Sequence, residues 1–135
     1  MVKLSKEILD IVNKQGRVGV LSTADKNGQP NAAYFGSLSA MEDDTVILAL
    51  GNNRSLKNLE ENPLAVFFCV TECPVTFNTP GYRLYLKSKE IQKQGSMLED
   101  MKKKIAELAG EDAAKMIVAY VLFEGTEIRP LVEMG

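Results

Sequence analysis

The sequence predicts a mainly β fold, a six-stranded antiparallel β-barrel with flanking helices. Two observations support this prediction. Six short apolar segments are separated by turn residues, and the segments with helical patterns stand at the ends of this series or between its strands. The chain has 135 residues, enough for one hydrophobic core but too few for a second. We therefore expect a single domain over residues 1–135.

The first elements are a helix and a hairpin. Ser5 is placed to cap a helix over residues 6–14, which carry apolar side chains on one side. A strand over residues 17–24 follows and leads to Asn27-Gly28, a dipeptide typical of hairpin turns. The second strand is expected over residues 29–40.

The middle of the chain adds three strands and a short helix. The third strand, residues 45–50, runs into a polar helix that stops before Pro63. Residues 64–71 are apolar on both faces, which predicts a central strand. Residues 82–91 are rich in tyrosine and leucine and predict the fifth strand.

The last third predicts one helix and one strand. Ser96-Met97-Leu98-Glu99 matches a capping box, so we expect a helix from Ser96 to about Leu108. Its expected apolar stripe consists of Leu98, Met101, Ile105 and Leu108. Residues 116–123 predict a strongly apolar last strand, and residues 124–130 a strand end and surface tail.

Composition excludes several classes of function. The 16 basic and 18 acidic residues give a net charge of −2, which argues against a nucleic-acid partner. No apolar run is long enough to span a membrane, and the N-terminus does not resemble a secretory signal, so we expect a cytoplasmic protein. The cysteines, Cys69 and Cys73, predict buried or unreactive thiols. Because the chain has no histidine, catalytic triads and His-ligated metal sites are excluded, and a bound cofactor would have to carry any redox reaction.

The segment from Gly51 to Pro63 is the strongest candidate for a binding site. Turn residues follow the third strand, and the short helix begins near Asn53 with Arg54, Ser55 and Lys57 in its first turn. The free N–H groups and dipole of a helix N-terminus favour an anion such as phosphate. Arginine can add a bidentate fork and lysine a point charge. The alternative is that Asn53 or Ser55 only caps a surface helix whose cations are solvated.

The chain resembles the pyridoxamine 5′-phosphate oxidase-like, FMN-binding split-barrel proteins. Four elements carry the likeness in the family's order: residues 20–23 with 27–31, residues 45–50 with 53–63, residues 81–91, and residues 116–123. Each element is weakly specific alone, but their order and spacing together cover nearly the whole chain. The chain lacks the basic and histidine residues expected in the substrate pocket of a true pyridoxamine phosphate oxidase, so we do not expect that reaction.

The resemblance implies a six-stranded split barrel that forms a homodimer with FMN at the subunit interface. It implies that Arg54 and Ser55 bind the FMN phosphate, with Asn53, Lys57 and Asn58 beside them. It also implies that the flavin ring lies along the second and third strands. The residues there are Ala32, Ala33, Tyr34, Ala49 and Leu50.

Two functions remain open from the sequence. The first is an FMN-dependent oxidoreductase that transfers electrons or hydride, with NADH, NADPH or another small redox partner. The second is a flavin-binding carrier or sensor without turnover, because no side chain stands out as a general acid or base. Tyr34, Ser37 and Tyr82 are the candidates near the ring, and the catalytic residues are unknown. No metal site and no membrane partner are expected.

Overall fold

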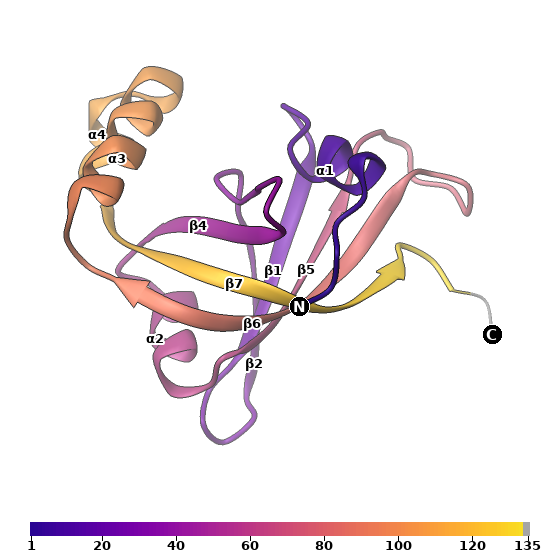
Figure 1. Cartoon of the computed structure of the whole chain (residues 1–135), viewed down its shortest axis with the longest axis horizontal. Helices are drawn as coiled ribbons and strands as arrows, with labels where there is room; N and C mark the ends of the chain where they lie inside the picture. The colour runs from indigo at the N-terminus through magenta and orange to yellow at the C-terminus, as the bar shows by residue number, and fades with distance from the viewer. Residues whose placement is uncertain (134–135) are drawn as a thin grey trace.

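The computed structural model describes residues 1–133 and confirms the mainly β architecture (Figure 1). The strands are β1 (Val18–Ala24), β2 (Pro30–Tyr34), β3 (Ser39–Ala40), β4 (Thr45–Gly51), β5 (Leu64–Val70), β6 (Gly81–Gln92) and β7 (Ile117–Pro130). The helices are α1 (Lys6–Val12), α2 (Arg54–Glu61), α3 (Ser96–Ala109) and α4 (Glu111–Lys115). All strand pairs are antiparallel, and they form one sheet in the order β2-β1-β5-β6-β7-β4-β3.

The sheet has seven strands because the predicted second strand is interrupted. Residues 35–38, which we call the β2–β3 link, leave the sheet, so β2 ends at Tyr34 and β3 begins at Ser39. β2 and β3 are the two end strands of the sheet, so this short link brings the two ends together. The sheet therefore curls, and β4 and β7 run across β1, β2 and β5 (Figure 1).

β5 is the central strand that the sequence predicts on one side of the barrel. It pairs with β1 along one edge and with β6 along the other. Phe67 at its centre is fully buried, and Leu21 of β1 and Leu84 of β6 stand opposite it. Helix α1 covers this core with Ile8 and Val12, and Ser5 caps the helix as expected.

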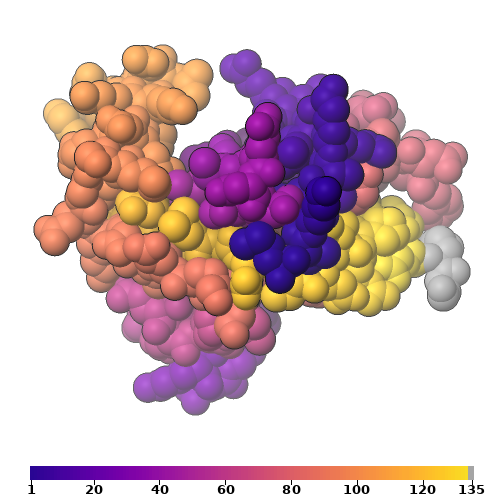
Figure 2. Space-filling view, in the orientation of Figure 1, coloured from indigo at the N-terminus to yellow at the C-terminus, as the bar shows by residue number. Residues whose placement is uncertain are grey.

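The C-terminal third differs from the sequence prediction in three ways. The N-cap of α3 is Gly95, at φ +114°, and no side chain caps the helix, so the predicted capping box does not form. Leu98 is buried, but Leu108 is 78% exposed because α3 and α4 project from the barrel, with a notch between them and β4 (Figure 2). The predicted tail is part of β7, which continues to Pro130 and pairs with β6.

The structure also bears on membrane and metal sites. No helix in the described part of the chain is long and apolar enough to cross a membrane. Within residues 1–133, no three His, Cys, Asp or Glu side chains gather in a way that could hold a metal ion. Both cysteines are free thiols, Cys69 buried and Cys73 exposed.

Candidate functional site

The turn between β4 and α2 has a fixed geometry. The pairing of β4 with β7 shifts between Leu50 and Gly51. A Cβ atom at Gly51 would lie 2.9 Å from the Met116 carbonyl oxygen, so the two backbones approach more closely than any side chain would allow. The Asn53 side chain then accepts a hydrogen bond from the Leu56 N–H at 3.0 Å and caps α2. Asn53 therefore caps α2, which is the alternative role that the sequence analysis considered for it.

Helix α2 is held on the barrel by apolar contacts and one buried hydrogen bond. Leu56 and Leu59 pack into the core. The Asn58 side-chain amide donates to Thr23 Oγ1 of β1 at 3.0 Å, and both residues are buried. Asn58 therefore has a structural role as well as a place in the candidate site.

Two cations stand exposed on the same helix. Arg54 and Lys57 point to solvent, whereas Ser55 between them is buried. Among the ion pairs formed within residues 1–133, none includes Arg54 or Lys57. Cations in the first turn are unfavourable for the helix dipole, and α2 has no acidic residue there. An anion at this helix end would reverse that electrostatic cost.

A cleft of about 400 Å³ lies between α2 and the turn that joins β1 to β2. One wall is the helix and the other is the turn, residues 25–29, which the Asn27-Gly28 dipeptide predicts. The lining residues are Arg54, Lys57, Asn58 and Glu61 from the helix and Asp25, Lys26, Asn27 and Gln29 from the turn. The Lys26 backbone N–H donates to Glu61 Oε1 at 3.1 Å and ties the two walls together.

The residues that line the cleft include three cations and two acids, a small excess of positive charge. Three of its lining residues are cations, Lys26, Arg54 and Lys57. Both acidic residues accept hydrogen bonds from the backbone. Asp25 Oδ1 accepts the N–H groups of Gln29 and Asn27 at 2.9 and 2.8 Å, and these bonds hold the pKa of Asp25 below its usual range.

The predicted ring residues fall into two segments, residues 32–34 of β2 and residues 49–50 of β4, which we call the ring segments. β2 is an end strand, and its Ala32 and Tyr34 side chains are exposed. The Ala49 and Leu50 side chains are buried, so only their backbone could meet a ligand. β3 pairs with β4 only at Val46 and Ile47, so it does not cover the β4 edge beyond them.

The structure brings some of the predicted site residues together and separates others. Arg54, Lys57 and Asn58 line one cleft, and Asn53 and Ser55 lie at the start of the same helix. Helix α2 contacts β2, the strand that carries the first ring segment. Lys26 also lines the cleft but was not among the site residues predicted from the sequence. Its position opposite Arg54 depends on how the β1–β2 hairpin lies against α2, which the sequence does not reveal.

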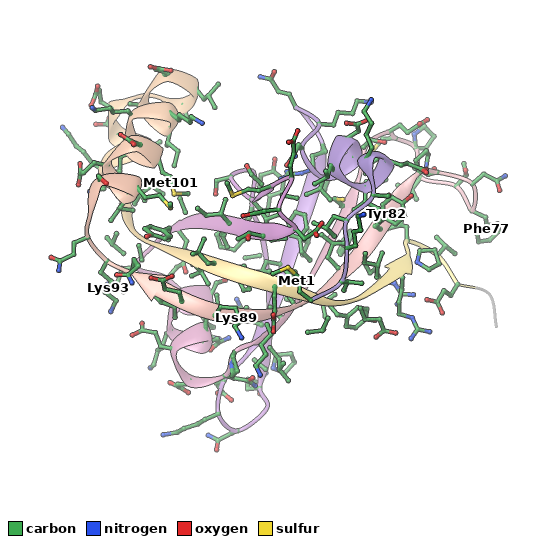
Figure 3. The ribbon with its side chains drawn as sticks, in the orientation of Figure 1. Met1, Phe77, Tyr82, Lys89, Lys93 and Met101 are labelled. Atoms are coloured by element: carbon green, nitrogen blue, oxygen red, sulfur yellow. The ribbon has the colours of Figure 1, made fainter. Side chains whose placement is uncertain are left out.

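Of the three side chains predicted to lie near the flavin ring, Tyr82 and Ser37 have other neighbours in the structure. Tyr82 lies on β6 beside α1 (Figure 3). In the sheet, β6 is separated from β2 by β1 and β5 and from β4 by β7. Burial raises the pKa of Tyr82, and the neighbouring Glu7 carboxylate raises it further. The Ser37 hydroxyl donates to the Ala49 carbonyl oxygen at 2.8 Å, which makes it a connection between the link and β4.

Solved structures share this fold over almost their whole length. An FMN-binding protein from Syntrophomonas wolfei subsp. wolfei has a TM-score of 0.83 at 22% identity, covering 98% of this chain and 88% of that one. HupZ from Group A Streptococcus has a TM-score of 0.75 at 25% identity, covering 97% and 94%. The haem storage protein HutZ from Vibrio cholerae has a TM-score of 0.67 at 16% identity, covering 96% and 95%.

Family membership follows from a match that spans most of the chain. No curated protein matches it. The family model described as pyridoxamine 5′-phosphate oxidase matches residues 4–127, which include β1 to β6 and most of β7. The chain therefore belongs to the pyridoxamine 5′-phosphate oxidase-like split-barrel family.

Proposed function

We propose that this protein is a flavoprotein that binds FMN with the phosphate at the N-terminus of α2. The exposed, unpaired cations Arg54 and Lys57 at this helix end, beside a cleft of about 400 Å³, carry the proposal. The donor set fits a phosphate, because a helix N-terminus, a guanidinium and an ammonium are all anion ligands. The similarity to an FMN-binding protein of the same fold supports the choice of FMN.

Each part of the site has a separate task in this proposal. Arg54, Lys57 and the first N–H groups of α2 bind the phosphate, and Lys26 adds positive charge from the opposite wall. The exposed apolar surface of Ala32 and Tyr34 offers a place for the flavin ring. The backbone edge of β4 offers hydrogen bonds to the polar rim of the ring. Flavins supply the hydride or electron transfer, so the protein needs to supply binding, orientation and shielding from water.

We further propose a homodimer with FMN at the subunit interface. Among residues 1–133, the exposed large apolar side chains include Tyr34 on β2, Met116 just before β7 and Val118 near the start of β7. Burial of such side chains against a second copy would remove them from water. Sedimentation analysis with and without FMN would test this. A monomer in both states would contradict it.

The decisive experiment compares FMN with riboflavin, which lacks the phosphate. Arg54→Ala should weaken FMN binding by roughly 1.5–3 kcal/mol, the contribution of a hydrogen bond to a charged group, or about 10- to 150-fold. The same variant should leave riboflavin binding unchanged. Lys103→Ala, on the exposed face of α3, is the matched control. Equal FMN affinity in the parent protein and Arg54→Ala would remove the phosphate assignment.

A second candidate function is flavin binding without turnover. It is favoured by the shortage of proton-transfer groups, because the chain has no histidine, Ser37 is hydrogen-bonded to Ala49 and Tyr82 lies away from the ring segments. Mixing the FMN-loaded protein with NADH or NADPH without oxygen separates the two functions. Loss of the oxidised flavin absorption supports an oxidoreductase, and an unchanged spectrum with both donors supports a carrier or sensor. Binding of haemin in place of FMN would contradict both.

A further inference from the structure

Arg17 is a buried cation with an unusual set of partners. It precedes β1, and only 5% of its surface is exposed. Its Nε donates to the Val12 carbonyl oxygen at the end of α1, and its Nη2 donates to the Leu38 carbonyl oxygen at 2.6 Å. The guanidinium carbon lies 5.2 Å from the centre of the Phe67 ring. The side chain therefore connects helix α1 to the β2–β3 link across the core.

No carboxylate of residues 1–133 forms an ion pair with this charge. Burial lowers the pKa of Arg17. Arginine nonetheless stays protonated near neutral pH. A buried cation without an ion pair is costly, whereas a methionine, which is shorter but of similar volume, would fill most of the space without that cost. The feature of Arg17 that methionine lacks is a rigid fork that reaches two carbonyl groups at once.

The link that Arg17 holds joins the two ring segments. The link follows Tyr34 directly, and Ser37 in its middle donates to Ala49. At its start, the Phe35 N–H donates to the Gly19 carbonyl oxygen at 2.9 Å. A Cβ atom at Gly19 would lie 3.0 Å from the Phe35 oxygen and 2.5 Å from the Phe67 ring, so the link sits tightly against β1. Arg17 supplies the third anchor, at the end of the link.

We propose that Arg17 is a positioning residue for the flavin site, because its fork fixes the β2–β3 link and thereby the placement of β2 relative to β4. This inference rests on the proposed function. The hydrogen bonds of Arg17 go to Val12 and Leu38, not to the ring segments. It acts through Leu38 and the link, so its removal should disturb FMN binding more than the loss of stability alone explains.

Asn13 provides a matched control from the same region. Its side chain exchanges two hydrogen bonds of 2.8 Å with the backbone of Ala40, so it also ties the end of α1 to the chain just beyond the link. Ala40 is additionally held in the sheet, where it pairs with Val46. Asn13→Ala therefore removes as many anchoring hydrogen bonds as Arg17→Met but leaves the link in place.

The experiment measures FMN affinity by fluorescence titration and amide hydrogen exchange in the FMN-free protein. We expect Arg17→Met to weaken FMN binding by roughly tenfold, the effect of losing about one hydrogen bond, and to speed exchange in residues 35–38. Arg17→Lys keeps the charge without the fork and should not restore either property. Asn13→Ala should change FMN affinity by less than about twofold, even if its melting temperature falls as far as that of Arg17→Met. Ser37→Ala should weaken FMN binding to a similar extent as Arg17→Met. It provides a second test of the role of the link if the Arg17→Met variant does not fold.

The outcomes separate this inference from the proposed function. A parent protein that binds no FMN overturns both. If the parent binds FMN, equal affinity in the Arg17 variants or in Ser37→Ala overturns this inference alone. Equal losses of affinity in Asn13→Ala and Arg17→Met would overturn it as well, because general destabilisation would then explain the result. Recovery of affinity in Arg17→Lys would assign the effect to charge instead of the fork.

Discussion

Helices α1 and α2 are built alike but differ in the charge of their first turns. Each is short, each is capped by a side chain (Ser5 or Asn53), and each packs apolar residues on the barrel. Helix α1 has both Lys6 and Glu7 in its first turn, so an acid that suits the positive end of the helix dipole offsets the lysine. Helix α2 has no acid in its first turn and has Arg54 there instead. The uncompensated cation at the start of α2 is therefore the feature on which the proposed phosphate site rests.

The largest expected effect tests core packing, which the two helices share. Ile8 of α1 and Leu56 of α2 are both buried in the core. Ile8→Ala and Leu56→Ala should each lower the free energy of unfolding by about 2–5 kcal/mol, because each truncation leaves a cavity. Urea denaturation measures the change. A loss below about 1 kcal/mol for either variant would show that its helix is not anchored as described.

The next largest effect tests the charge at the helix N-termini, in which the two helices differ. Lys57→Ala should weaken FMN binding by roughly 1.5 kcal/mol, or about tenfold, and the loss should shrink at high salt because Lys57 is exposed. It should leave the free energy of unfolding within about 0.5 kcal/mol of the parent value. Lys6→Ala, an exposed lysine in the first turn of α1, is the control for titration and denaturation. Similar FMN affinities in the two variants would break the distinction between the helices.

The smallest effect concerns the turn that faces α2. Backbone N–H groups of Gln29 and Asn27 stabilise the ionised Asp25 carboxylate and lower its pKa in the folded protein. This contribution to stability is present above the unfolded pKa of about 3.9 and is lost as the pH falls through the lower folded value. Asp25→Asn should therefore be slightly less stable than the parent at pH 7, and the difference should shrink as the pH falls below the unfolded pKa of about 3.9. A difference that is constant between pH 7 and pH 3 would contradict this account.

The sequence predicted features whose causes are local. The Asn27-Gly28 turn, the Ser5 cap and the start of α2 depend on neighbouring residues, and the structure confirms them. The apolar run of β5 also predicted correctly a strand with a neighbour on each side, although only one of its faces is fully buried.

The features that the sequence could not predict depend on contacts between distant segments. The predicted second strand breaks at residues 35–38 because the link is bound by Gly19, Arg17 and Ala49, none of which is a near neighbour in sequence. Arg17 looks like an ordinary residue at the edge of a strand until the fold encloses it. Lys26 and Arg54 line the same cleft only because the hairpin lies against α2.

The two walls of the cleft differ in how freely evolution can change them. The α2 wall is tied to the core through Leu56, Leu59 and Asn58, so its backbone position is fixed and only its exposed side chains can change without affecting folding. The turn at residues 25–29 is mostly exposed and joins two neighbouring antiparallel strands. Insertions or substitutions in it would alter the shape and charge of the cleft while leaving the core intact. Related chains of this fold could therefore acquire new ligands by changing one hairpin turn, which also makes that turn the natural place to engineer this protein.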